Sequence, residues 1–208
     1  IVEKALNFKA ENYMPEIAVD KEDEIKAEKF LKESKIDKYA CIVPATTNKL
    51  KEWKIENFEK IIEFISKKYK NYKILLIGGE NDMAKIEKLK RENCILAINL
   101  NLRVLYEILK KSSLVIANDG GVMHLAWLSG TRTIALWGPI NLKLMKPLKN
   151  SIILHHKTEC YPCHTEKCRR KISCIDLITI EEVEREIGRV IRGGKFTPTP
   201  RTFYKLEA

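Results

Sequence analysis

Short apolar runs alternate along the chain with longer segments in which apolar residues recur every three or four positions. Uninterrupted short runs predict strands buried on both faces, and the longer period predicts amphipathic helices. The predicted strands are residues 39–45, 73–79, 94–100, 114–118, 133–139 and 151–156. The predicted helices are residues 21–34, 55–69, 81–93, 102–112, 122–130 and 179–194.

The order of these segments predicts an α/β fold. Strands that alternate with helices are typical of βαβ units, which build a parallel sheet covered by helices on both faces. Within the helix at 102–112, Leu102, Leu105 and Leu109 form one apolar stripe and are expected to face the core. The last helix begins with Thr179 and has Glu182 three residues later, which is the sequence of a capping box.

Three loops are expected to lie together on one rim of the sheet, because ligands and loops gather beyond the carboxyl ends of parallel strands. These loops follow the strands at 39–45, 73–79 and 114–118. The polar residues and glycines that they bring to the rim are Thr46, Thr47, Lys51, Gly78, Gly79, Glu80, Asp82, Asp119, Gly120, Gly121 and His124.

The third loop, "NDGGVMH" (118–124), predicts an anion site. A helix that starts directly after a strand presents unpaired N–H groups and the positive end of its dipole, and glycines let a ligand approach the backbone. His124 in the first turn can donate a hydrogen bond, whereas ionised Asp119 only accepts and therefore suits hydroxyl groups. A diphosphate joined to a sugar satisfies both requirements.

Each of these residues alone has a simpler structural explanation. Asp119 can cap the helix, His124 can pack or cap, and Gly78 with Gly79 can form an ordinary turn. The chain also lacks the GxGxxG pattern of dinucleotide-binding proteins. The joint placement of the residues on one rim is what favours a ligand site.

Composition narrows the choice of partners. The net charge is +10 over 208 residues, mostly from lysines that are scattered and not interleaved with aromatic residues. This distribution indicates solvated helix faces, and we expect no nucleic-acid partner. No apolar run reaches the length of a membrane helix, which is about 18 residues. The sequence starts with Ile1 and not with Met, so we expect the chain to be processed or to be part of a longer protein.

Four of the six cysteines, Cys160, Cys163, Cys168 and Cys174, lie within fifteen residues. Such a cluster can be a zinc site, a set of disulfides or a group of free thiols. The spacing lacks a second CxxC pair, which weakens the zinc interpretation. A cytosolic setting works against disulfides.

Three segments resemble glycosyltransferase family 9, the ADP-heptose:lipopolysaccharide heptosyltransferases, and in particular heptosyltransferase II. They are "ANDGGVMHLAWLSGTRTIALWGP", "TTNKLKEW" and "LLIGGENDM", and the resemblance runs from about residue 40 to residue 192. It implies the GT-B architecture, in which two Rossmann-like domains flank a cleft. This chain resembles the C-terminal, donor-binding half, with an interdomain linker and entering helix at 1–38, the Rossmann-like domain at 39–192 and a tail at 193–208.

The resemblance also implies roles for single residues. Those around the donor would be Thr46, Thr47 and Lys51 at the diphosphate, Asp82, with Glu80 as the alternative, at the ribose, Leu100 at the adenine, Asp119 at the sugar hydroxyls, and Gly120, Gly121 and His124 at the helix start. Two positions depart from the family pattern: Gly120 replaces a Thr or Ser, and Asp82 replaces a Glu.

The implied reaction is an inverting transfer in which an acceptor hydroxyl displaces the nucleoside diphosphate, with no cofactor and no metal. The catalytic base is expected in the N-terminal domain, so none is named in this chain, which alone would be inactive. The implied partners are an ADP-sugar donor, a lipid-linked or glycan acceptor and the N-terminal domain, at the cytoplasmic face of the inner membrane. The alternatives are a stand-alone nucleotide-binding module and a zinc-containing interaction domain.

Overall fold

The computed structural model describes residues 17–142, 150–163, 165, 167–193 and 201–203. Within them a seven-stranded sheet has the order β3-β2-β1-β4-β5-β6-β7, and every neighbouring pair is parallel. The strands are β1 (Tyr39–Val43), β2 (Lys73–Gly78), β3 (Cys94–Ile98), β4 (Leu114–Asn118), β5 (Thr133–Trp137), β6 (Ser151–His156) and β7 (Arg201–Phe203).

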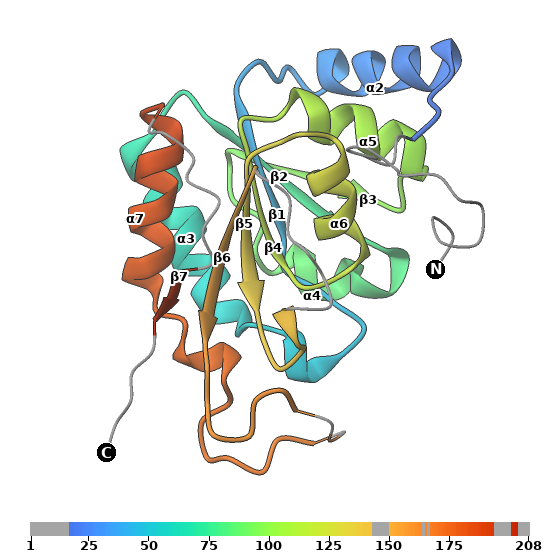
Figure 1. Ribbon diagram of the computed structural model, residues 1–208. Coiled ribbons are helices and arrows are strands. Elements are labelled where there is room, and N and C mark those ends of the chain that lie inside the picture. The colour runs from blue at the N-terminus through green and yellow to red at the C-terminus, as the bar shows by residue number, and fades with distance from the viewer. Residues whose placement is uncertain (1–16, 143–149, 164, 166, 194–200, 204–208) are drawn as a thin grey trace, which may run out of the picture.

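Helices cover both faces of this sheet, as Figure 1 shows. One face carries α3 (Ile55–Lys68), α4 (Met83–Glu87) and α7 (Ile180–Ile191). The other carries α2 (Lys21–Glu33), α5 (Leu102–Lys111) and α6 (Gly121–Leu128). The connections in the described part of the chain contain the short 3-10 turns η1 (Lys49–Lys51), η2 (Glu80–Asp82) and η4 (Ile175–Leu177).

The predicted α/β fold is confirmed. The central strands are buried on both faces, which explains why they appear in the sequence as short apolar runs. Successive residues of β1 point to opposite faces, with Ala40 and Ile42 in the core under α3 and α7, and Cys41 in the core under α5 and α6. A strand buried on both faces is mostly apolar, so it reads as a continuous apolar run. The capping box at Thr179 and Glu182 is also confirmed, with both reciprocal hydrogen bonds formed.

Three details differ from the sequence predictions. The helix predicted for 81–93 ends at Glu87, because Asn93 already accepts a hydrogen bond from Ile74 of β2 and the chain must be extended there. Leu102 does not face the core: it is 66% exposed, at the first position of α5. Residues 201–203, assigned to a tail, form β7 beside β6, whereas 1–16, 194–200 and 204–208 lie outside the described residues.

The strand order sets the place where a ligand can enter. The chain runs outward from β1 to β2 and β3, and then returns to the other side of β1 to form β4. Where strand order reverses in this way, the loops after the two central strands diverge and leave a crevice at their carboxyl ends. We use the name crevice for the switch point between the segment after Val43 and the segment after Asn118, which hydrogen bonds link to each other.

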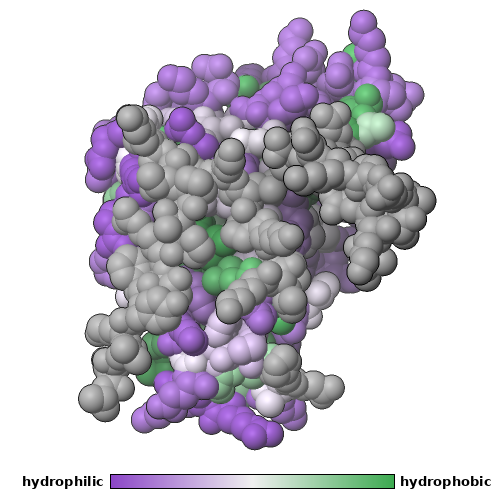
Figure 2. Space-filling view, in the orientation of Figure 1, coloured by the Kyte–Doolittle hydropathy of each residue, from purple (hydrophilic) through white to green (hydrophobic). Residues whose placement is uncertain are grey.

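The visible surface is largely hydrophilic over α2, with scattered apolar residues elsewhere (Figure 2). No helix among the described residues has the length and apolar character needed to span a bilayer.

Acid should destabilise this fold through His155 of β6. Its side chain is buried, and an imidazole nitrogen lies 3.2 Å from the Trp137 carbonyl oxygen. Burial lowers the pKa of His155 from its ordinary value, the bond to Trp137 opposes this shift, and His156 and Lys157 add to it. Below pH about 6.5 the unfolded chain therefore binds the proton first, and the free energy of unfolding falls as the pH falls.

Urea unfolding between pH 7.5 and pH 5.5 measures this effect. The wild-type chain should lose stability more steeply than His155→Phe, with a difference of at most about 1.4 kcal/mol per pH unit. Equal slopes for the two proteins would show that His155 does not titrate differently on folding.

Candidate functional site

The candidate site centres on an ion pair between Lys51 and Asp119 at the carboxyl ends of β1 and β4. Lys51 Nζ lies 2.8 Å from Asp119 Oδ2, and the two side chains are 20% and 2% exposed. Lys51 ends the turn η1, and Asn48 caps its start with a side chain that accepts a hydrogen bond from Leu50 N. The turn thus fixes the backbone from which the lysine reaches across the crevice.

Asp119 is held from two sides. Its carbonyl oxygen accepts a hydrogen bond of 3.1 Å from Thr46 Oγ1, and its amide donates to the Leu136 carbonyl. Apart from the Lys51 ammonium, the buried Oδ2 atom has no hydrogen-bond partner among the described residues. A buried carboxylate is costly unless it is paired and hydrogen-bonded, so Asp119 retains capacity to accept hydrogen bonds from a ligand.

His124 faces the same carboxylate from the first turn of α6. Its Nε2 atom lies 3.8 Å from Asp119 Oδ1, and its ring packs edge-on against Trp127 at 5.0 Å. Burial lowers the pKa of His124, the Asp119 carboxylate opposes this shift, and the Lys51 ammonium adds to it. His124 is therefore neutral at pH 7 and acts as a hydrogen-bonding group, not as a cation.

The start of α6 supplies a second positive element. Gly120 is the N-cap, and the first helical hydrogen bond runs from His124 N to Gly120 O. The preceding N–H groups have no partner within the helix. A Cβ atom at Gly121 would meet no other atom within 4 Å, so the helix end is open to an approaching group. Backbone donors and Lys51 together form a site for an anion.

Asn118 holds the crevice together, and the sequence reasoning missed it. Its side chain is buried, donates a 2.9 Å hydrogen bond to Pro44 O and accepts a 3.1 Å bond from Trp53 N. One amide thus joins the end of β4 to both ends of the loop that carries Lys51. The available signal was a polar residue at the last position of a fully buried strand, directly before Asp119.

Gly138 was also missed as a site residue. A Cβ atom there would lie 3.0 Å from Leu50 O and 3.5 Å from Lys51 Cα. Only a residue without a side chain lets the end of β5 approach the turn that carries the lysine this closely.

The other predicted residues lie farther along the same edge or contact the protein itself. Asp82 accepts a 3.0 Å hydrogen bond from Gly79 N and so closes the turn after β2. Leu100, after β3, is partly buried against the core beneath α5. Thr47 and Glu80 are exposed. The structure therefore brings together Thr46, Lys51, Asp119, Gly120, Gly121 and His124.

The cysteine cluster lies in the long connection between β6 and η4, which projects beyond the carboxyl edge of the sheet (Figure 1). Its four cysteines, with Leu50 and Pro139, line a cavity of about 20 Å³. Among the described residues, no group of three or more His, Cys, Asp or Glu side chains is arranged to hold a metal ion. All six cysteines are free, and His164 lies outside the described residues.

The sequence model of glycosyltransferase family 9 (heptosyltransferase) matches residues 1–173, and so begins well upstream of residue 40. Among proteins of curated function, none matches the chain.

Several solved structures share the fold at low sequence identity. A family 9 glycosyltransferase from Veillonella parvula is 20% identical, with a TM-score of 0.80 over 92% of this chain and 58% of its own. Heptosyltransferase II from E. coli is 16% identical, with a TM-score of 0.71 over 90% and 56%. E. coli heptosyltransferase WaaC with ADP-2-deoxy-2-fluoro heptose is 18% identical, with a TM-score of 0.63 over 90% and 52%. The chain thus spans just over half the length of these structures.

Removing the side-chain amide of Asn118 should lower the free energy of unfolding more than removing an exposed side-chain amide. Asn118→Ala leaves the buried Pro44 carbonyl and Trp53 amide unpaired, which should lower the free energy of unfolding by about 3 kcal/mol. Asn101→Ala is a matched control, because Asn101 only caps α5 with one exposed hydrogen bond; it should cost about 1 kcal/mol. Chemical denaturation measures both, and equal losses would contradict the bridging role of Asn118.

Gly138 and Gly121 should respond differently to alanine. Gly138→Ala pushes against the Leu50 backbone and should destabilise the chain by about 1–3 kcal/mol. Gly121→Ala adds a methyl group to open space and should be neutral or slightly stabilising. Thermal unfolding measures the stability of the two variants. A wild-type melting temperature for Gly138→Ala would show that the turn is not closely packed.

Proposed function

The chain belongs to glycosyltransferase family 9, and from this membership and the geometry of the crevice we propose that it is the donor-binding domain of an inverting heptosyltransferase. Its donor is a nucleoside-diphosphate sugar, ADP-heptose or a related ADP-sugar. The observation that carries the proposal is the Lys51–Asp119 pair beside the open start of α6, which offers positive charge and a hydroxyl acceptor within one site.

The diphosphate occupies the start of α6. N–H groups of the first turn and the positive end of the helix dipole face its oxygens, and Lys51 adds a full charge. The ammonium group has three donors, so it can contact a phosphate oxygen while it keeps its bond to Asp119. Thr46 and Thr47 lie beside the lysine on the same loop.

Asp119 recognises the sugar. Thr46 and Leu136 fix its backbone, and its carboxylate, paired with Lys51, retains acceptor capacity, which suits the hydroxyl groups of a heptose. Neutral His124 lies between the carboxylate and the helix start and can donate a hydrogen bond to either the sugar or the phosphate. Asp82 and Leu100, farther along the edge, are assigned to the ribose and the adenine.

The reaction is a displacement at the anomeric carbon. An acceptor hydroxyl oxygen forms the new bond to that carbon, and the bond to the diphosphate oxygen breaks, so the configuration inverts. Lys51 and the helix-end N–H groups stabilise the negative charge of the departing nucleoside diphosphate. The proton of the acceptor passes to a base in the N-terminal half of the enzyme.

The acceptor also belongs to that half. We assign it to the class of lipopolysaccharide-core or similar envelope glycans, and the reaction to the cytoplasmic face of the inner membrane. In this proposal the present chain supplies donor recognition and leaving-group stabilisation, and the transferase activity needs both halves.

Calorimetric titration with ADP, UDP and GDP tests donor recognition. ADP should bind most tightly, and Lys51→Ala should raise its Kd about tenfold, because a charged hydrogen bond contributes about 1.5–3 kcal/mol. Lys49→Ala is a matched control from the same turn and should change the Kd less than about twofold. Binding that ignores the base and survives Lys51→Ala would contradict the proposal.

A companion titration isolates the sugar. Asp119→Asn keeps the shape of the side chain but removes its charge, so it should weaken ADP-heptose more than ADP. An equal effect on both ligands would remove Asp119 from sugar recognition.

A further inference from the structure

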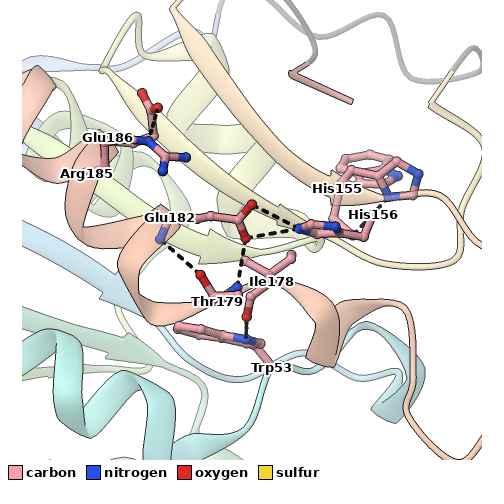
Figure 3. A network of polar contacts seen from close by, with 9 residues as sticks. Trp53, His155, His156, Ile178, Thr179, Glu182, Arg185 and Glu186 are labelled. Atoms are coloured by element: carbon pink, nitrogen blue, oxygen red, sulfur yellow. Dashed lines mark hydrogen bonds and ion pairs between the residues drawn. The ribbon is translucent and has the colours of Figure 1, made fainter. Parts of the chain in front are cut away.

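A second polar pair, His156 and Glu182, joins the end of β6 to the start of α7. His156 Nε2 is 3.0 Å from one carboxylate oxygen of Glu182 and 3.1 Å from the other (Figure 3). The side chains are only 14% and 12% exposed. The pair joins the two ends of the long connection that carries the cysteines.

The cap of α7 does not need His156. Glu182 Oε2 accepts a 2.8 Å bond from Thr179 N, and Thr179 Oγ1 accepts a 3.2 Å bond from Glu182 N. These two bonds complete the capping box. Burial raises the pKa of Glu182, but the bonds from His156 and Thr179 outweigh that effect and lower it, so the carboxylate stays ionised. His156 therefore contributes something beyond helix capping.

Ile178, the residue before the N-cap Thr179, contacts the loop that carries Lys51. Ile178 O accepts a 3.0 Å hydrogen bond from the indole Nε1 of Trp53, which is fully buried (Figure 3). The Trp53 backbone amide donates in turn to Asn118. Trp53 lies two residues after Lys51, so the position of the lysine backbone depends on where Ile178 and Thr179 are held.

We propose that His156 and Glu182 are positioning residues of the donor site, which act through Ile178 and Trp53 to hold the turn that carries Lys51. The pair fixes the start of α7 against β6, and the Ile178 carbonyl then fixes the indole. The consequence for catalysis rests on the proposed function, because it requires that Lys51 contacts the donor diphosphate.

Helix stability alone does not explain why His156 pairs with Glu182, whereas a positioning role does. A helix cap needs local groups only, whereas His156 is 26 residues away from Glu182 and belongs to a different element. Holding two elements in register costs side-chain entropy, and a partly buried polar pair of this kind is weak evidence for stability. The pair instead fixes the Ile178 carbonyl, which accepts the hydrogen bond from the Trp53 indole, and so helps to position the site.

Hydrogen exchange at single amides, measured by NMR, tests the positioning role without any ligand. In His156→Ala the Trp53 amide should exchange at least about tenfold faster, because its local support is lost. Asp20→Ala is the control: it removes a side-chain hydrogen bond at the start of another helix, α2, where Asp20 Oδ1 accepts a 2.9 Å bond from Asp23 N. It should leave the Trp53 amide unchanged once global stability is taken into account.

His156→Gln restores a donor at nearly the same reach and should recover most of the protection. The affinity for ADP should fall about fivefold in His156→Ala and remain at the wild-type value in Asp20→Ala. If His156→Ala does not fold, Glu182→Gln takes its place, since it keeps the oxygen that caps Thr179 but loses the charge that holds His156.

Equal Trp53 exchange in the His156 variant and the Asp20 control would overturn the proposal and leave the pair as a local contact between β6 and α7. The exchange result stands by itself: a wild-type chain that fails to bind ADP would refute the proposed function, while faster Trp53 exchange would still establish the positioning role.

Discussion

The geometry of the crevice depends on the side-chain amide of Asn118. Placed at the end of a buried strand, it pairs with the Pro44 carbonyl and the Trp53 amide, which would otherwise be buried without partners. Unmade bonds of this kind cost more than formed bonds gain, so the amide dictates where the loop between them runs. The position of Lys51, and its reach to Asp119, follow from that constraint.

The charges on the rim are better explained by ligand binding than by a contribution to stability. Asp119 is almost fully buried, and Lys51 is its counter-charge at 2.8 Å. Removing two charges from water costs several kcal/mol, which their attraction often fails to recover, so an apolar pair would serve stability equally well. Beside an open helix start, the same two charges offer a ready environment for an anion carrying hydroxyl groups.

The sequence predicted what depends on local pattern and missed what depends on distant contacts. Periodicity located the strands and the cap at Thr179, and the rule on strand ends placed Thr46, Lys51 and Asp119 on one rim. Asn118 escaped because its partners lie 65 and 74 residues away, and the Trp53–Ile178 bond spans 125 residues. No periodicity encodes such contacts. The ligand roles of the rim residues remain predictions.

An NMR titration of the isotopically labelled chain with ADP tests the central claim, that a nucleoside diphosphate binds where β1 and β4 end, most directly. The account predicts that the largest amide shifts fall on Gly121, Val122, Met123 and Lys51, with little change in the connection that carries the cysteines. Shifts confined to that connection, or to the pocket that Phe64 of α3 and Ile180 of α7 line, would contradict it.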